Sequence, residues 1–383
     1  MSRPQGKHRA RILSEIRPGA SSLRADLVRN TGLSAATVAR VARDLIGGKV
    51  LREVRLAPSS VGRPSTGLQI NGGCGAVLGV SALPPAARLA VLDLSGRLLH
   101  ESDQSMDWES GADAILATLR SSMQRLLRRL PAGIPRLRGV GLALPGQWDR
   151  EAGVSNIFPR VPDWKDVPIR RLLMEWTRLP AWLVGYAPSL AVAEQAQGTG
   201  REPQDLLCVE VADNIAMGVI ANGRVLEGVS GNAGELGHIA VEPRGEPCYC
   251  GSRGCLETVA TTRAVEDAVR RGPERKAATY ERVVALAREG NGAAIRLLSA
   301  AAVALGTGLG TALNLFNPRL LVLRGRFFDA GGDLVLTPLT KSLQGHALLN
   351  TVRPVEIRRS ALGAISSAYG AGITAVRRVI QTL

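Results

Sequence analysis

The amino-acid sequence predicts an α/β protein, with an N-terminal winged helix-turn-helix followed by a larger body of two similar α/β halves. Three observations lead to this prediction. Positive charge is concentrated in the first seventy residues, strands alternate with helices from residue 76 onward, and three of the five cysteines lie within eight positions of one another. A chain of 383 residues is also too long for one ordinary hydrophobic core, so we expect two or three domains.

The distribution of net charge separates the N-terminal segment from the rest of the chain. Residues 1–70 hold thirteen lysines or arginines and four acidic residues, a net charge of +9 out of the total of +15. Such a concentration is typical of a module that binds a polyanion, attached to a nearly neutral body. A solvated basic tail would carry similar charge, but residues 8–55 show an apolar periodicity that a tail lacks.

The order of elements in this basic segment is that of a winged helix-turn-helix. A first helix is expected over residues 8–17. A second helix, with Ser22 as its cap, stops at Gly32, and a third begins at Ser34 and ends at the Gly47-Gly48 pair. The stretches "KVLREVRL" and "TGLQI" then read as the two strands of the wing.

The outward side of the third helix is the predicted DNA-binding surface. Small residues at its start allow close backbone approach to a major groove, and Arg40 can reach a guanine edge or a phosphate. Arg63, beside a glycine and a proline in "VGRPS", is expected to enter the adjacent minor groove from the wing. The alternative is a three-helix interaction module, which the concentration of charge disfavours. The predicted contact residues are Ser34, Ala35, Ala36, Thr37, Arg40, Arg43 and Arg63.

The pattern changes at residue 76, where short strands begin to alternate with helices. Strands are expected at "AVLGVSAL", "ARLAVLDLSGRLLHES", "LRGVGLALPGQW", "LLCVEVADNIAMGVIANGRVL" and "RLLVLRG", and helices at about 110–129, 262–271, 279–289 and 292–314. Hairpin-linked strand triplets and alternating helices indicate the two similar halves.

The sequence does not show the patterns that direct a chain into a membrane or out of the cell. The sequence contains no stretch of eighteen consecutive apolar residues without a charged or polar interruption. We therefore expect no transmembrane span and no membrane partner. The basic N-terminus lacks the apolar core of a signal peptide, and an odd number of cysteines argues against a disulfide framework. These features predict a protein of the reducing cytosol.

Four residues have the composition of a metal site. His238, Cys248, Cys250 and Cys255 offer one imidazole and three thiolates, a set that suits tetrahedral zinc. A thiol–disulfide pair is disfavoured because Cys-x-Cys is strained as a disulfide, and three unrelated buried thiols remain the other alternative. Four protein ligands leave no open position for a catalytic water, so we expect one structural zinc per chain.

These residues also carry a resemblance to a known family. The block "GELGH…CYCGSRGCLE" resembles the zinc signature of the ROK family (repressors, uncharacterised reading frames and sugar kinases), and "GRP" at 62–64 resembles its regulator branch. The stretches "LDLSGRLL", "GVGLALPG" and "NPRLLVLRG" extend the resemblance over nearly the whole chain. It implies a two-lobed actin-like ATPase fold with a sugar cleft. The implied domains are 1–70, 71–195 and 196–383, with the last helix packing back on the first lobe.

The motifs that the family's kinases use for nucleotide phosphates are altered in this chain. At the place of the Asp-x-Gly-Gly-Thr turn stands "SALPP", in which Ser81 replaces the aspartate and Pro84 and Pro85 offer no amide donor. At the place of the phosphate hairpin, "VADNIAMG" carries Asp213, whose charge would repel a phosphate.

The position of the kinases' general base is altered too. Tyr186 stands where the family has an aspartate, and Gly185 replaces the sugar-binding asparagine. A tyrosine of ordinary pKa is a poor base at neutral pH. Without a phosphate cradle or a base, phosphoryl transfer is not expected, and no catalytic residue is predicted.

The resemblance implies a ligand site made of Glu235, His238 and Glu257, with His238 also a zinc ligand. Carboxylates suit polyols because their two oxygens accept paired hydroxyl groups. Arg160, in "FPRVPDW", stands at another sugar-contacting position and would favour an anionic sugar derivative. Each of these residues could instead only support its loop.

The resulting expectation is a cytoplasmic, nucleoid-associated transcription factor, a repressor of carbohydrate genes that responds to a small carbohydrate effector. It would bind a palindromic double-stranded DNA operator as a homodimer or a dimer of dimers. Two alternatives belong to other classes: a sugar kinase with an appended DNA-binding domain, and a regulator that no longer senses a ligand.

Overall fold

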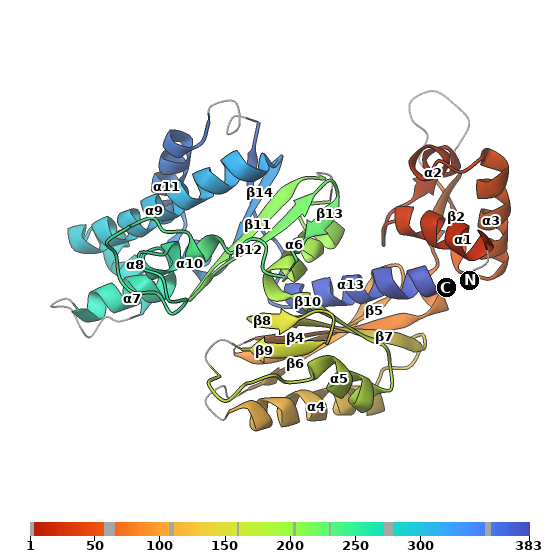
Figure 1. Ribbon diagram of the computed structural model, residues 1–383. Helices are drawn as coiled ribbons and strands as arrows, with labels where there is room; N and C mark the ends of the chain where they lie inside the picture. The colour runs from red at the N-terminus through yellow and green to blue at the C-terminus, as the bar shows by residue number, and fades with distance from the viewer. Residues whose placement is uncertain are drawn as a thin grey trace. The chain divides into compact units, whose positions relative to one another are not determined.

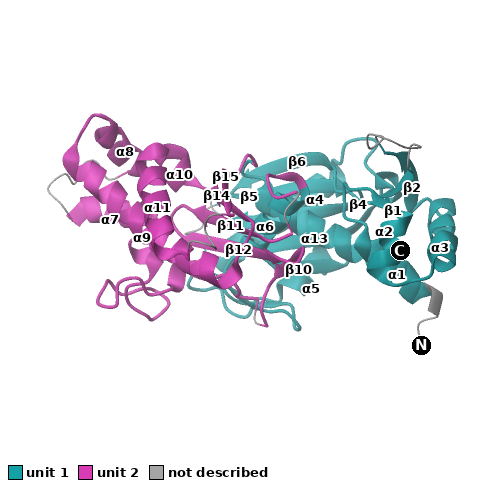
Figure 2. Cartoon of the chain, turned by 90° about the horizontal axis from the view of Figure 1, so that it is seen from above, with its two compact units in different colours: residues 1–196, 363–383 teal, residues 197–362 magenta. Residues whose placement is uncertain are grey.

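A computed structural model describes residues 4–56, 66–83, 85–106, 111–158, 161–201, 204–229, 231–271, 279–348 and 354–383. The chain forms two compact units, one made of residues 1–196 and 363–383 and the other of residues 197–362 (Figure 2). The basic N-terminal segment therefore shares a unit with the first α/β body, and the C-terminal residues return to that same unit. A domain boundary at residue 70 remains a prediction.

The N-terminal segment contains three helices and a small sheet: α1 (Pro4–Glu15), β1 (Ser22–Leu23), α2 (Arg24–Thr31), α3 (Ala35–Gly47), β2 (Leu51–Arg55) and β3 (Thr66–Ile70). Gly32 ends α2 in the left-handed conformation at φ 64°, and the Ser34 side chain accepts a hydrogen bond from the Thr37 amide at the start of α3. These two boundaries confirm the predicted turn between the helices.

The prediction that Ser22 caps the second helix is wrong. Ser22 and Leu23 form the short strand β1, which pairs antiparallel with β3, so that the small sheet has the order β1-β3-β2. The backbone of Ser22 is used for strand pairing with Leu68, and Leu23 becomes the residue that precedes the helix. The wing therefore has a third, two-residue strand that the local sequence pattern did not indicate.

The larger part of this unit is built on a five-stranded sheet of order β10-β7-β4-β5-β6. Its strands are β4 (Ala76–Leu83), β5 (Ala86–Asp93), β6 (Leu98–Ser105), β7 (Leu137–Leu144) and β10 (Ala181–Gly185). Strands β4, β5 and β6 pair antiparallel in succession, whereas β7 pairs in parallel with β4, and β10 pairs in parallel with β7. A separate small hairpin is formed by β8 (Gln147–Asp149) and β9 (Val154–Ile157).

Helices cover both faces of this sheet (Figure 1). α4 (Ala112–Arg128) and α5 (Ile169–Thr177) pack on one face through buried residues such as Ile115 and Leu173. α13 (Ser366–Thr382) packs on the other face against β4, β5 and β7, and α6 (Tyr186–Gln197) approaches α13 at Ser189. Adjacent strands thus place their alternate side chains into two apolar layers, as a sheet buried on both sides requires.

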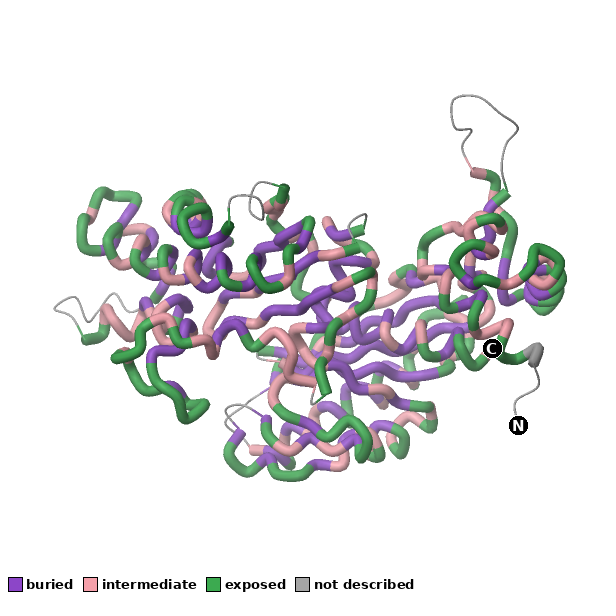
Figure 3. Tube along the Cα trace, turned by 45° about the horizontal axis from the view of Figure 1, so that its top comes forward, coloured by how far each residue is buried: buried purple, intermediate pink, exposed green. Residues whose placement is uncertain are grey.

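The second unit repeats this topology. Its sheet has the order β13-β12-β11-β14-β15, formed by β11 (Leu206–Val211), β12 (Ile215–Ala221), β13 (Arg224–Leu226), β14 (Leu320–Arg324) and β15 (Glu356–Arg359). Again an antiparallel triplet comes first, and two parallel strands are added beside its first member. The common order confirms the prediction of two similar α/β halves. The inner strands of both sheets are largely buried, as the purple tube in Figure 3 shows, whereas the edge strands β6, β13 and β15 are more exposed.

The core of the second unit lies between this sheet and its helices. These are α7 (Thr262–Arg271), α8 (Tyr280–Arg288), α9 (Gly292–Phe316), α10 (Arg326–Gly331) and α11 (Asp333–His346). α9 is the one helix within the described residues that is long and apolar enough to cross a membrane by length and composition. Leu298, Leu305 and Leu309 of α9 belong to the core of the unit, and a core helix meets the same criteria.

Candidate zinc and effector site and DNA-binding surface

The third helix presents the predicted DNA-binding residues outward. Val38, Val41, Ala42 and Leu45 are buried, which fixes the rotation of α3 in its unit. Ser34, Ala35, Ala36, Arg40 and Arg43 are exposed, and Thr37 is half-buried. Two guanidinium groups therefore project from the exposed side of a helix whose first turn is made of small residues. Arg63 lies outside the described residues, and its minor-groove contact stays a prediction.

The zinc-ligand block lies between β13 and α7, in a loop stabilised by backbone pairing. Isolated bridges join Ala240 to Cys255 and Pro247 to Arg253. Gly254, at φ 66°, lies so close to the chain at Glu242 that a Cβ there would come within 1.6 Å of the Glu242 carbonyl oxygen. Only glycine allows this approach, and it folds the cysteine-bearing end of the loop back toward His238.

The loop brings together the four predicted metal ligands. Each residue contributes one ligand atom, and these four atoms all lie within 4.8 Å of one another. The residues are His238, Cys248, Cys250 and Cys255. The Cys248 sulfur is 3.6 Å from His238 Nδ1, and the Cys250 sulfur is 3.6 Å from that of Cys255. A tetrahedral zinc with Zn–S bonds of about 2.3 Å has edges of roughly 3.7 Å between its ligands. The set therefore fits zinc in the number, kind and spacing of its donors.

The thiols of this cluster differ in their surroundings. Burial raises the pKa of Cys255 to about 12 and also raises the pKa of Cys248 above its ordinary value. The main-chain amide of Ser252 lowers the pKa of the exposed Cys250 thiol. A metal that binds here must displace protons from the buried thiols, so its retention weakens as pH falls.

The predicted ligand-contacting residues Glu235, His238 and Glu257 lie in the same region. His238 Nε2 points away from the thiols, 3.9 Å from a Glu235 carboxylate oxygen. Glu257 belongs to the short 3₁₀ turn Leu256–Thr258, and it accepts a hydrogen bond from the Ile215 amide at 3.1 Å. The loop with the candidate metal ligands thus holds one imidazole and two carboxylates in one region. Arg160 lies outside the described residues, and its role stays a prediction.

Tyr249 is a member of this cluster that the sequence patterns did not single out. Its hydroxyl is 3.2 Å from His238 Nε2, and its ring stands edge-on to the imidazole at 5.2 Å. Burial raises the pKa of Tyr249, and the charges of Glu257 and Glu235 raise it further. Its position between two cysteine ligands is the sequence signal that could have identified it.

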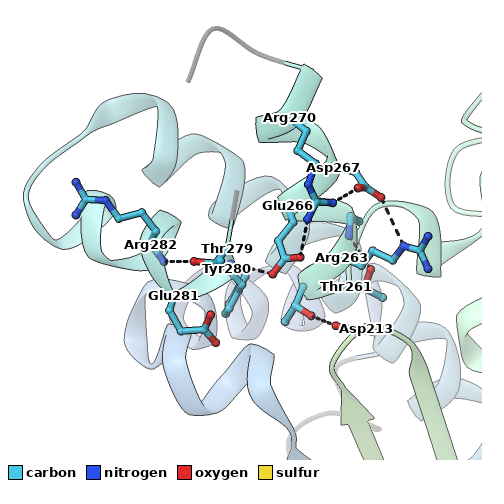
Figure 4. Close-up of polar contacts among 12 residues, drawn as sticks. Asp213, Thr261, Arg263, Glu266, Asp267, Arg270, Thr279, Tyr280, Glu281 and Arg282 are labelled. Carbon is cyan, nitrogen blue, oxygen red and sulfur yellow. Dashed lines mark hydrogen bonds and ion pairs between the residues drawn. The ribbon is translucent and has the colours of Figure 1, made fainter. Parts of the chain in front are cut away.

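The position of the phosphate hairpin, between β11 and β12, contains an ion-pair network. Asp213 bonds the Thr262 hydroxyl at 3.0 Å and lies 3.6 Å from Arg326. Arg326 also pairs with Glu266 at 2.9 Å and with Glu281 at 2.6 Å. Figure 4 shows Glu266 bonded to the main chain of α8 at Tyr280 and lying next to Arg270. One guanidinium thus joins the hairpin, α7 and α8 at the start of α10.

The other residues that stand at kinase-motif positions, Ser81 and Tyr186, lie in the first unit. Ser81 is fully buried at the end of β4, where its hydroxyl accepts a hydrogen bond from Ser367 of α13 at 2.8 Å. Tyr186 is the first residue of α6, and its carbonyl accepts a hydrogen bond from the Ser189 hydroxyl. Pro84 lies outside the described residues.

Comparison with known proteins assigns the chain to a family. Residues 79–378, more than half of the chain, match the sequence profile of the ROK family. The chain belongs to the ROK family. An N-acetylglucosamine repressor from Escherichia coli O6:H1 is 30% identical over 366 residues, covering 90% of this chain and 87% of the repressor.

Two solved ROK structures are similar over most of their length. A ROK transcriptional regulator, described as a homologue of the E. coli Mlc protein, matches with a TM-score of 0.81 at 23% identity and covers 98% of this chain and 96% of its own. A ROK hexokinase from Thermus thermophilus matches with a TM-score of 0.69 at 32% identity. The match covers 78% of this chain and 97% of the hexokinase. These ROK structures confirm the predicted two-lobed fold.

Proposed function

We propose that this ROK protein is a DNA-binding transcriptional regulator, a repressor of carbohydrate genes controlled by a sugar or sugar derivative. The observation that carries the proposal is the exposed arginine-bearing face of α3, in a segment with a net charge of +9. A basic helix-turn-helix with its second helix exposed is the usual reader of a major groove. The similarity to an N-acetylglucosamine repressor supports the same function.

The effector site in this proposal is the cluster of Glu235, His238 and Glu257. Two carboxylates and one imidazole offer acceptors and a donor to the hydroxyl groups of a sugar. One structural zinc, held by His238, Cys248, Cys250 and Cys255, would fix the loop that carries them. Arg160 would add an anion-binding group, which extends the effector class to sugar phosphates or sugar acids.

A sugar kinase is the second candidate, and the similarity to a hexokinase is the observation in its favour. Three features count against it. Ser81 is buried and hydrogen-bonded to α13, Tyr186 stands at the position of the base, and Asp213 is engaged with Arg326 and Thr262. Phosphoryl transfer needs a base and donors aimed at the phosphates, and these residues supply neither.

The proposed partners follow from the symmetry of DNA. A homodimer or a dimer of dimers would match a palindromic operator, in which the half-sites repeat the two-fold symmetry of the protein. The proposed location is the bacterial cytoplasm in association with the nucleoid. A regulator that has lost its effector is the remaining alternative, and only a ligand-binding measurement separates it from the main proposal.

The test of DNA binding combines genome-wide mapping of bound sites with titration of one mapped operator. We expect Arg40→Ala to weaken operator binding by about 1–3 kcal/mol if Arg40 reads a base. The matched control is Arg120→Ala, which removes the same charge from an exposed position on α4. Equal operator binding by the unmodified protein, Arg40→Ala and Arg120→Ala would refute the assignment of α3 as the recognition helix.

The test of the effector adds N-acetylglucosamine, glucose, xylose and their phosphates to the same titration. A sugar that changes operator affinity supports the proposal, whichever the direction of the change. Normal operator binding that no sugar or sugar phosphate alters would favour the ligand-independent regulator.

A further inference from the structure

Tyr249 has an unusual position for an aromatic residue in a metal-binding loop. It lies between the ligands Cys248 and Cys250, and 70% of its surface is exposed. Its hydroxyl is nevertheless turned back to within 3.2 Å of His238 Nε2, and the two rings stand at 81°. The side chain therefore covers the nitrogen of His238 that faces away from the thiols.

The zinc-ligand set determines the hydrogen-bonding character of that nitrogen. His238 Nδ1 faces the Cys248 sulfur at 3.6 Å and is the nitrogen that would hold the metal. A neutral imidazole with Nδ1 on a metal carries its proton on Nε2, which is then a donor. The groups next to this N–H are the Tyr249 hydroxyl and, at 3.9 Å, the Glu235 carboxylate.

The Tyr249 hydroxyl offers the same hydrogen-bonding groups as a sugar hydroxyl. It can accept the Nε2 hydrogen and still donate its own proton, and a sugar hydroxyl at this position would do both. The Glu235 carboxylate lies 3.9 Å from Nε2, and its charge acts on the Tyr249 hydroxyl, so an acceptor for such a donated hydrogen is close by. The phenol thus takes the position at which a sugar hydroxyl is expected to meet His238.

We propose that Tyr249 is an internal occupant of the effector site, and that a sugar binds by displacing its hydroxyl from His238 Nε2. This inference rests on the proposed function of the cluster as a sugar site. It makes Tyr249 a specificity-determining residue, since only a ligand with a hydroxyl at this position replaces the lost hydrogen bond. A deoxy sugar that lacks this hydroxyl leaves the Nε2 donor unpaired and binds more weakly.

The opposite possibility is that Tyr249 forms a platform for the sugar ring. In that case its removal would weaken binding, whereas removal of a competitor strengthens it. The sign of the change therefore decides between the two roles. The proposal can be tested with and without sugar.

The first test needs no sugar. The zinc-loaded protein is prepared with 3-fluorotyrosine, and the Tyr249 resonance is identified by its absence in Tyr249→Phe. We expect a fluorine shift displaced from that of free fluorotyrosine, because the ring lies edge-on to the His238 imidazole. A resonance at the position of the free amino acid would show that the side chain is directed to solvent and would overturn the proposal.

The second test measures sugar binding by calorimetry, with N-acetylglucosamine, glucose and xylose as probes. Tyr249→Phe keeps the ring and removes the hydroxyl, and we expect it to bind the active sugar roughly 2- to 10-fold more tightly. Glu246→Gln, an exposed change in the same loop, serves as the control and should bind as the unmodified protein does. Equal or weaker binding by Tyr249→Phe would overturn the proposal.

The two tests keep this inference separate from the proposed function. A displaced fluorine resonance together with no binding of any sugar, in either protein, would contradict the sugar-responsive function and with it the role of Tyr249 as a competitor. A displaced resonance that moves to the free position when sugar is added supports both.

Discussion

Cys250 is the most exposed of the three thiols in the metal cluster, and the Ser252 amide lowers its pKa. It contributes little to the hydrophobic core, so its replacement tests the metal with little direct effect on packing. We expect the unmodified protein to hold about one zinc per chain and Cys250→Ser to lose it. Elemental analysis by plasma mass spectrometry measures this.

Cys74→Ser is the control for this prediction, since Cys74 lies outside the cluster and its replacement should keep the zinc. Zinc retention by Cys250→Ser would mean that this sulfur is not a ligand. A metal-free protein with a normal effector response would contradict the structural role given to the zinc.

Arg326 stabilises the second unit through charge, and this makes a prediction about pH. Its pairing with Glu281 lowers the pKa of that carboxylate from its ordinary value of 4.5. A depressed folded-state pKa contributes stability that is present above 4.5 and is lost as pH falls through the depressed value. Arg326→Met should therefore lower stability at pH 7 and have little effect in stronger acid.

At pH 7 we expect Arg326→Met to lower the free energy of unfolding by about 1–2 kcal/mol, a figure that already allows for the partial exposure of the Arg326 side chain. Thermal unfolding at pH 7 and again in acid compares the variant with the unmodified protein. Arg282→Met removes an exposed ion pair between Arg282 of α8 and Glu289 at the end of that helix, and its effect should stay below about 0.5 kcal/mol. An Arg326→Met effect that is independent of pH would contradict the electrostatic account.

Among the elements, α13 packs unusually close to its neighbours. A Cβ at Gly370 would come within 1.8 Å of the Ser189 carbonyl oxygen of α6, and one at Gly79 of β4 within 2.0 Å of the Ala368 carbonyl oxygen of α13. Glycine in a helix normally costs about 0.5–1 kcal/mol relative to alanine. Here the close backbone approach outweighs that cost, since an added methyl group would force α13 away from α6.

We therefore expect Gly370→Ala to destabilise the first unit, by about 1–3 kcal/mol. Gly6→Ala in α1 is the matched change, because a Cβ there meets nothing within 4 Å. It should be neutral or slightly stabilising in the same thermal unfolding measurement. A stabilising Gly370→Ala would show that the gap between α13 and α6 is wider than the structure has it.

α13 also connects the DNA-binding segment to the first α/β sheet. The Tyr369 hydroxyl donates to the Gly96 carbonyl at the β5–β6 turn, and Arg9 of α1 donates to the main-chain oxygen of Leu383. The same helix bonds Ser81 of β4 through Ser367. A single rigid helix thus contacts the sheet of the lobe and the first helix of the DNA-binding segment.

At the scale of the whole molecule, the altered kinase motifs bear on how a regulator of the proposed kind would be switched. If no nucleotide binds, an effector shifts such a protein only by its own preference for one conformation. A preference of a few kcal/mol is sufficient if it reaches two DNA-binding segments in a dimer. Switching of this kind requires a protein that neither binds ATP tightly nor hydrolyses it.

We accordingly expect no sugar phosphorylation by the unmodified protein, and none by Tyr186→Asp. The substitution restores a base but leaves Pro84 and Pro85 without amide donors and Asp213 at the phosphate hairpin. A coupled ADP-release assay with several sugars, run beside an ATP-binding titration, measures both. Turnover above background in the unmodified protein would overturn the regulator-only function, and tight ATP binding without turnover would indicate a nucleotide-sensing repressor.

Much of this organisation was already determined by the sequence, because it depends on residues close together in the chain. Gly32 and Ser34 define the turn of the helix-turn-helix by local backbone preference and capping. The ligands from His238 to Cys255 lie within eighteen positions, so their spacing alone indicated a metal site. Alternating strands and helices likewise indicated the two repeated halves.

Only the tertiary structure decided which distant groups meet. Ser22 became a strand residue because β3, more than forty positions away, supplies its partner. Arg326 meets Asp213 and Glu266 because the sheet places the β11–β12 hairpin, α7 and the end of β14 side by side. Tyr249 faces His238 because the loop folds back at Gly254. Such contacts depend on how whole elements pack, and local propensity and spacing carry no information about them.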